Sequence, residues 1–304
     1  SVYRRYSNFS IETIKNTFRT SLTLSDSSRS TSECLISRSG DMLKNMHVVF
    51  EIPSVKCKNI DGTLYQFKWV KNLGSVLLNE IDFMIEAQII ERLRSNWLYL
   101  YPNMYSTKEE LEIFNKMSGN IKELYDPQAF TNNQNYVIPG RKITIPLPFW
   151  FTKSSGLAFP LIALQKNKVH LKITCNALKD AFLVSNNNGL SWIKPPTNIT
   201  LDKFSFNTPV DFDPYLMCEY IFIDDEQRYR IIHNELVYTI HTPQYIDVVE
   251  LQQNLQHVSL PIKHPIKELI WFAAKNSRID RNDWFNFSNY IDENLTEIEA
   301  INNT

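Results

Sequence analysis

Two stretches of alternating apolar and polar residues, between positions 143 and 175, constrain the fold of this chain more than any other feature. The first is apolar at positions 143, 145, 147, 149 and 151, and the second has Val169, Leu171, Ile173 and Cys175 between polar neighbours. Successive side chains of a β-strand point to opposite faces, so a period of two predicts strands with one face in a core. We therefore expect strands over 143–151 and 161–175, in a β-sandwich or a barrel.

Similar patterns predict further strands along the chain. They cover 33–37, 46–52, 64–70 and 81–89, while 216–224 is apolar on both faces, which is typical of a central strand covered on both sides. A new alternating set starts at 236, and apolar runs follow at 258–260 and 269–272. Pro146 and Pro148 lack amide donors, so their strand is expected at a sheet edge or at a bulge.

One helix is predicted in an excursion that covers roughly 101–138. Thr107 is followed three residues later by Glu110, which is the spacing of a capping box. Apolar residues recur at 111, 114 and 117, and Gly119 is suited to end the helix in a left-handed conformation. Long excursions in sandwich proteins project from one end and often make contacts.

Composition excludes several classes of protein. The chain has 304 residues, of which 43% are hydrophobic, and its formal net charge of -1 is not the electrostatic pattern of a nucleic-acid-binding protein. The four cysteines form no CxxC pair, so we expect reduced thiols and no metal site. No apolar run approaches the ~20 residues that span a bilayer, and we expect no signal peptide. Because the chain begins with Ser1, we expect a portion of a longer product.

Few residues are candidates for catalysis, and no glycine-rich nucleotide motif, GxSxG or HExxH occurs. Asp224 and Asp225 follow a predicted strand and could hold a metal or act on a glycoside, but strand and helix ends commonly carry such residues. Arg4 and Arg5 could bind phosphate, although arginines beside tyrosines more often pack or form ion pairs. We predict no catalytic, cofactor-binding or metal-binding residues, and no enzyme.

Four tryptophans, Trp69, Trp97, Trp150 and Trp271, could form a platform on which sugars stack. They belong to separate predicted elements, however, and the large apolar rings of tryptophan commonly serve cores and subunit contacts. Core packing or subunit contact is therefore the preferred interpretation.

Seven stretches of the sequence, taken together and in order, resemble the major capsid proteins of nucleo-cytoplasmic large DNA viruses. They are spread across nearly the whole chain, which makes a chance match improbable. The stretches are VYRRYSNFSIE (2–12), ISRSGDM (36–42), WVKNLGSVLLNEIDFMI (69–85), IPLPFWF (145–151), GLAFPLIALQ (156–165), EYIFIDDEQRYR (219–230) and HPIKELIW (264–271).

The resemblance implies an all-β double jelly roll, in which two β-sandwiches lie side by side. Residues 1–232 would form the first jelly roll, with the excursion at 101–138, and residues 233–304 the N-terminal part of an incomplete second roll. The implied function is that of a structural capsid protein, which forms pseudo-hexagonal homotrimeric capsomers of an icosahedral shell. The implied partners are itself and minor capsid proteins, with no direct nucleic acid and possible indirect contact with an inner membrane. The implied location is the virion, assembled in the host cytoplasm.

Two other functions remain open at this point. A jelly-roll protein that binds carbohydrate or a receptor predicts a concave site lined by aromatic residues. A viral scaffold protein would form a transient lattice and leave before maturation. The chain also departs from the resemblance at Glu86 and Ala87, where relatives tend to carry two glycines, so a tight turn is not expected there.

Overall fold

The computed structural model describes residues 8–19, 22–130, 135–164, 166–186, 189–206, 210–246, 250 and 257–288. Four antiparallel strands form the first of its two main sheets. Backbone pairing sets their order across the sheet as β1 (Phe9–Thr17), β13 (Tyr215–Ile223), β3 (Met42–Ile52) and β10 (Arg141–Pro146). The strand expected at 216–224 is therefore central, as predicted. Its outward side chains, such as those of Met217 and Glu219, are only half-buried, so its second face is partly covered.

Four further antiparallel strands form the second main sheet, in the order β2 (Ser30–Leu35), β11 (Val169–Cys175), β7 (Leu78–Ile85) and β8 (Gln88–Arg94). If these eight strands are numbered by their order in the chain, the first sheet reads 1, 8, 3, 6 from edge to edge and the second reads 2, 7, 4, 5. The chain thus passes repeatedly from one sheet to the other, which is the winding of a jelly roll.

One hydrophobic core fills the space between the two sheets. Along β11, Val169, Leu171, Ile173 and Cys175 are buried and their neighbours are half-buried, which confirms the predicted alternation. Fully burying an aliphatic side chain of this size contributes about 1.5–3 kcal/mol to stability. The first sheet supplies residues such as Phe50 from β3, whose side chain is likewise buried.

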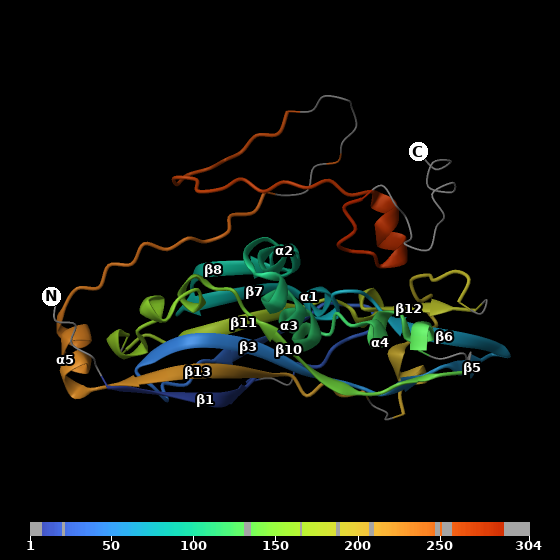
Figure 1. Cartoon of the computed structure of the whole chain (residues 1–304), viewed down its shortest axis with the longest axis horizontal. Coiled ribbons are helices and arrows are strands. Elements are labelled where there is room, and N and C mark those ends of the chain that lie inside the picture. Colours follow the sequence, from blue (N-terminus) through green and yellow to red (C-terminus); the bar gives the residue numbers. More distant parts are fainter. Residues whose placement is uncertain are drawn as a thin grey trace.

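Two small sheets extend the roll at the end opposite α5 (Asp225–His233), at the right of Figure 1. One has the order β12 (Phe182–Ser185), β6 (Thr63–Trp69) and β5 (Lys58–Ile60), and the other pairs β4 (Val55–Lys56) with β9 (Val137–Ile138). The short 3₁₀ helices at and near this end are η1 (Pro127–Phe130), η5 (Leu178–Asp180) and η6 (Leu201–Lys203).

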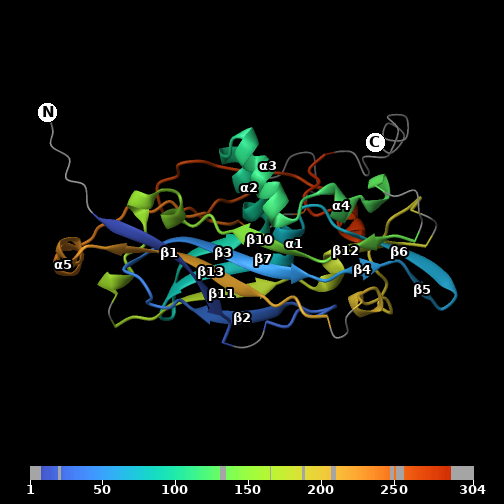
Figure 2. The ribbon, with the colours of Figure 1, turned by 60° about the horizontal axis from the view of Figure 1, so that its bottom comes forward.

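The predicted helix is confirmed as α3 (Lys108–Ser118). Thr107 Oγ1 accepts a hydrogen bond from the Glu110 amide at 3.3 Å, Glu110 Oε2 accepts one from the Thr107 amide at 2.8 Å, and Gly119 is left-handed with φ 80°. The helical excursion starts earlier than expected, at α2 (Ser95–Tyr105), and continues to α4 (Lys122–Tyr125). Figure 2 shows these three helices on one side of the roll, opposite β2. The short helix α1 (Leu73–Leu77) precedes β7.

A tight turn joins β7 to β8, contrary to the expectation for Glu86 and Ala87. The predicted strand over 81–89 is in fact a hairpin in which Ile85 pairs with Gln88, and Glu86 adopts φ 51°. The Glu86 amide donates to the Lys168 carbonyl at 2.8 Å, and the Glu86 carboxylate accepts a hydrogen bond from the Lys168 amide. These contacts with the chain before β11 hold a conformation that a non-glycine residue adopts only at a cost.

The strand expected over 143–151 ends at Pro146, where β10 lies at the edge of its sheet as predicted. Leu147 still donates to the Met46 carbonyl at 3.0 Å, but Phe149 then leads into the 3₁₀ helix η2 (Trp150–Thr152). Pro148 cannot donate to a ladder, and the aromatic side chains reach the core from the 3₁₀ helix instead. The strand expected over 161–175 likewise starts only at β11, after η3 (Ser155–Leu157) and η4 (Leu161–Ala163).

Beyond β13 the chain differs most from expectation. Residues 225–233 form the helix α5, which was not predicted, and the strands expected from 236, at 258–260 and at 269–272 do not form in the part of the chain that the structure describes. These residues run as extended chain back along the roll, orange to red in Figure 1, with η7 (Asn276–Arg281) near the end. An extended segment becomes a strand only when a neighbouring strand accepts its backbone hydrogen bonds.

Candidate functional site

The acidic pair considered for catalysis has a structural role. Asp224 is the N-cap of α5, and its Oδ1 accepts a hydrogen bond from the Gln227 amide at 2.9 Å. Asp225 forms an ion pair with Arg228, with 2.9 Å between Oδ1 and Nη1. Within the described residues, no three His, Cys, Asp or Glu side chains gather in a way that could hold a metal ion. The carboxylates therefore stabilise a helix end.

The cysteines offer no reactive thiol. All four are free, as expected, and all are buried. Burial raises the pKa of the Cys34 thiol to about 11 and that of the Cys175 thiol to about 12. Only the thiolate is an effective nucleophile or metal ligand, so these residues behave as small apolar side chains.

The four tryptophans do not share a surface. Trp69 and Trp150 are buried in the core, Trp97 is half-buried on α2, and Trp271 is 82% exposed in the extended C-terminal region. A sugar platform is therefore not assembled from them. Arg4 and Arg5, considered for phosphate binding, lie outside the described residues.

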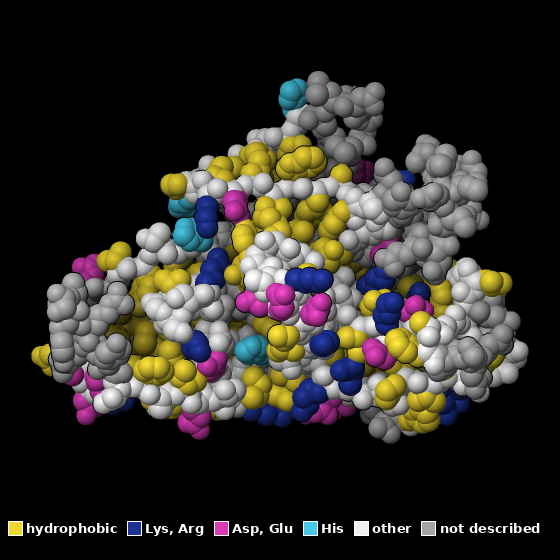
Figure 3. Space-filling model, viewed as in Figure 1, with side chains coloured by type: hydrophobic (Ala, Val, Ile, Leu, Met, Phe, Trp, Pro, Cys, Tyr) yellow, Lys and Arg dark blue, Asp and Glu magenta, His cyan; other side chains and the backbone are white. Residues whose placement is uncertain are grey.

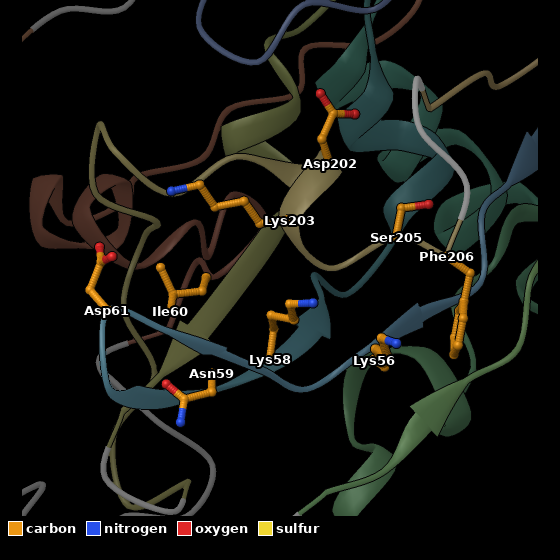
Figure 4. Close-up of a pocket in the computed structure, with 9 residues that line it drawn as sticks. All are labelled: Lys56, Lys58, Asn59, Ile60, Asp61, Asp202, Lys203, Ser205 and Phe206. Carbon is orange, nitrogen blue, oxygen red and sulfur yellow. The ribbon is translucent and has the colours of Figure 1, made fainter.

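An open hollow of about 550 Å³ lies at the end of the roll that carries β4 and β5. Figure 4 shows side chains of both charges around it, with Lys203 extending toward the side on which Asp61 lies. The Lys56 ammonium lies 4.5 Å from the centre of the Phe206 ring, and Lys203 donates to a backbone carbonyl at 2.8 Å. The mixed lining and the single aromatic ring do not resemble the aromatic-lined concave site of a carbohydrate-binding protein.

Exposed apolar side chains mark the region after α5 as a candidate contact surface. Val237 is 85% exposed and Trp271 is 82% exposed, and Ile266 and Leu269 are also more than half exposed. Figure 3 shows apolar side chains gathered over this part of the molecule. Several large exposed apolar residues within one segment are typical of surfaces that bind other protein.

The end of the same region is anchored on the roll. The Asn282 side-chain amide donates to the carbonyls of Lys179 and Phe182 at 2.6 Å and 2.9 Å, and the Trp284 indole donates to the Asp180 carbonyl at 2.8 Å. Asn282 is 3% exposed and adopts φ 52°, a conformation that asparagine tolerates better than most residues.

Helix α2 provides two further contacts with this region. The rings of Tyr99 and Phe285 stack with their centres 4.5 Å apart, and the Tyr105 hydroxyl donates a hydrogen bond to the Glu268 carboxylate. The excursion therefore holds the C-terminal region against the roll, in agreement with the expectation that such an excursion makes contacts.

The outer face of the first sheet is a second broad surface. Phe9 is 65% exposed and Ile11 is 44% exposed, and they lie opposite Ile223 and Ile221 on β13. Phe9, Ile11 and the half-buried Ile223 form an apolar strip at the end of the sheet near α5, beside the buried Ile221. Sequence reasoning did not single them out, because exposure of a strand face depends on its neighbours.

An ion pair between a buried aspartate and a partly exposed arginine near α5 was also missed. Asp41 is 8% exposed, and its two carboxylate oxygens accept hydrogen bonds from Arg228 Nε and Nη2 at 3.0 Å and 2.9 Å. Both residues lie in stretches that carry the resemblance, which is the one signal in the sequence that could have drawn attention to them.

No helix among the described residues has both the length and the apolar character required to cross a membrane.

The family model described as "Major capsid protein N-terminus" matches residues 1–224 of the chain. Among curated proteins, the chain is similar to "Probable capsid protein 4" of Acanthamoeba polyphaga mimivirus, with 25% identity over 94% of the chain and 70% of that protein. It is also similar to the "Major capsid protein" of Phaeocystis pouchetii virus, with 27% identity over 99% of the chain and 58% of that protein. The chain therefore spans little more than half to two thirds of the length of these relatives.

Solved capsid structures share the fold. The PBCV-1 virus capsid, a quasi-atomic model, matches 76% of this chain and 46% of its own chain with a TM-score of 0.53 and 22% identity. The Faustovirus major capsid protein matches 76% of this chain and 57% of its own with a TM-score of 0.51 and 11% identity. These neighbours are double jelly rolls, as the resemblance implied. The family model matches residues 1–224, which is most of the chain, and solved capsid structures share its fold. The chain therefore belongs to the viral major capsid protein family.

Proposed function

We propose that this protein is a structural subunit of the capsid of a large DNA virus and performs no catalysis. The observation that carries the proposal is the jelly roll built from two four-stranded sheets within the residues that match the capsid family model. Two packed sheets with one continuous core form a rigid body, which is what a shell subunit requires. The relatives that bear the name of capsid protein support this function.

We further propose that the protein forms homotrimers, which act as pseudo-hexagonal capsomers and tile an icosahedral shell. Symmetric oligomers bury extended, self-complementary surfaces, and obligate contacts usually exceed ~2,000 Å². The apolar strip around Phe9 and Ile11 and the exposed residues after α5 offer such surfaces. A formal net charge of -1 keeps repulsion between many copies small.

The division of the chain is also a proposal: residues 1–232 as the first roll, and residues 233–304 as the beginning of a second roll. The exposed apolar side chains between 236 and 272 support it, because the rest of a second sandwich would cover them. Residues 289–304 lie outside the described residues.

Partners other than copies of the chain follow from the same function. Minor capsid proteins would bind the shell, and an inner membrane would be contacted only indirectly. Direct binding of nucleic acid is not proposed, because the charge is close to neutral. The protein would be assembled in the host cytoplasm and located in the virion.

Mass photometry of the full-length protein tests the assembly. A trimer is expected at micromolar concentration, and a stable monomer would contradict it. The variants Val237→Asp and Leu190→Asp sharpen the test, because both side chains are almost fully exposed, at 85% and 87%, and Leu190 lies in a loop at the other end of the roll. The change at Val237 should impair assembly, and the change at Leu190 should leave it intact.

Two alternatives have separate outcomes. Binding to a glycan array by a protein that stays monomeric would favour the carbohydrate-binding function. Absence of the protein from purified mature particles, together with presence in assembling ones, would favour a transient scaffold.

A further inference from the structure

A glutamate lies inside the roll at a position that the proposed function does not use. Glu91 is in β8, directly opposite Phe83 of β7, and its side chain points with that of Phe83 toward the core. Glu91 is 2% exposed. Phe83 in turn contacts the rings of Phe149 and Phe151 at centre distances of 5.5 Å and 5.0 Å, so the carboxyl group borders an aromatic cluster.

The polar contacts of Glu91 are incomplete. Its Oε2 accepts a hydrogen bond from the Trp150 amide at 2.9 Å. Its Oε1 is buried and has no hydrogen-bond partner among the described residues, and the same is true of the Trp150 indole nitrogen. A buried carboxylate with one satisfied oxygen is unfavourable, whereas a neutral carboxyl group in the same place is tolerated far better.

Residues 238–245, which we call the strap, cover this position. The Tyr238 ring lies against the Trp150 ring, with 5.4 Å between centres. The Tyr245 hydroxyl accepts a hydrogen bond from the Arg94 amide at 3.0 Å and donates one to the Arg92 carbonyl at 3.2 Å. The strap therefore closes over Glu91 through contacts on either side of it.

The charged groups around Glu91 would offset the negative charge of its ionised form only in part. On its own strand, Arg92 forms an ion pair with Asp82 at 2.6 Å, and Arg94 pairs with Glu80 at 3.4 Å, both on the outward side of the sheet. Lys153, from the turn after η2, is the cation that acts on Glu91, and its own pKa is lowered by burial.

Two tyrosines complete the titratable groups around Glu91. Tyr101 of α2 and Tyr245 of the strap both feel the charge of Glu91, and burial raises the pKa of each. His241 is an exposed residue of the strap itself. For Glu91, burial raises the pKa from 4.5 to about 7, against the opposing effects of the Trp150 amide and Lys153.

We propose that Glu91 is a proton-sensitive latch for the strap: protonated Glu91 keeps residues 238–245 seated, and ionised Glu91 favours their release. The physical reason is that release lets water reach the carboxylate, which stabilises its charged form. The strap leads from α5 to the C-terminal region, so the latch would control how firmly that region is held against the roll in mildly alkaline solution.

Chymotrypsin cleavage of the Tyr245–Ile246 bond in the full chain tests the latch. Tyr245 must leave its place beside Arg94 before the protease can bind its ring, so the cleavage rate reports the open fraction. The rate, measured by mass spectrometry, is divided at each pH by that of a free peptide of the same sequence. With a pKa of about 7 when closed and 4.5 when open, this ratio should rise about tenfold between pH 6 and pH 8.

Two variants make the test specific. Glu91→Gln keeps an acceptor for the Trp150 amide but cannot ionise, and its ratio should not change over this range. Glu12→Gln replaces an exposed carboxylate on β1 and should behave like the wild type. A constant ratio in the wild-type chain would overturn the proposal, and so would an equal rise in Glu91→Gln, because the response would then not depend on Glu91.

Discussion

Asp41 and Arg228, which are 187 residues apart in the sequence, form a bidentate ion pair that joins the turn before β3 to helix α5. The Asp41 carboxylate also accepts a hydrogen bond from the Ile223 amide at 2.9 Å. One buried carboxylate thus fixes the end of β13, the last strand of the roll, and the direction in which the chain leaves it.

Replacement of Asp41 by alanine should destabilise the protein more than replacement of Arg228 by alanine. The first change leaves the Ile223 amide without its acceptor, which costs about 1–3 kcal/mol for a buried donor. The second removes a partly exposed guanidinium, and the Asp41 carboxylate keeps the hydrogen bond from the Ile223 amide. Urea unfolding measures both, and Glu226→Ala, which breaks the exposed pair with Arg230, is a control expected to have little effect. Equal losses for Asp41 and Arg228 would contradict the role of the amide.

Gly40→Ala should reduce the free energy of unfolding by about 1–3 kcal/mol, the usual range for overpacking. A Cβ atom at Gly40 would lie 2.6 Å from the Cβ atom of Tyr220, and Tyr220 is fully buried. Gly156→Ala is the matched control, because its Cβ atom would come no closer than 3.8 Å to Ser154 Oγ. The urea midpoint should fall for the first variant and stay unchanged for the second.

Asn282→Gly and Asn282→Ala should both loosen the anchor of the C-terminal region. Each variant loses the two hydrogen bonds to the carbonyls of Lys179 and Phe182, but only alanine also strains the backbone at φ 52°. Faster proteolysis within 276–288 is expected, with alanine the more severe. If neither variant is cleaved faster than the wild type, the stack of Tyr99 on Phe285 holds the region without Asn282.

The stability of the wild-type protein should fall as pH rises from 5 to 8, because of Glu91. Its pKa is raised by burial to about 7 in the folded state, against an ordinary value of 4.5. Folding therefore favours the protonated form of Glu91. The cost of Glu91 to the free energy of unfolding is absent below pH 4.5, grows between pH 4.5 and pH 7, and is complete above pH 7. The Glu91 contribution to the fall between pH 5 and pH 8 is about 2–3 kcal/mol. Urea unfolding of Glu91→Gln should lack this part of the decline, and an identical decline would refute the assignment.

Local patterns in the sequence predicted much of the roll. The alternation along 169–175 placed the correct side chains in the core, and Thr107 with Glu110 and Gly119 marked both ends of α3. The turn at Glu86 was not predictable in this way, because its left-handed backbone is held by Lys168, which is distant in sequence. The absence of metal and catalytic motifs was readable from the sequence, whereas the buried position of Glu91 was not.

The sequence by itself determined the buried face of β11, the two ends of α3 and the family to which the chain belongs, because these depend on residue type and spacing. Only the tertiary structure decided which strands are neighbours, where Phe149 leaves the strand for a 3₁₀ helix, and which partners meet at Asp41 and Glu91. It also decided that the described residues after 236 form no β-strand. The physical reason is that hydrogen bonding between strands and burial of charge depend on residues far apart in the sequence, whose proximity no local pattern records.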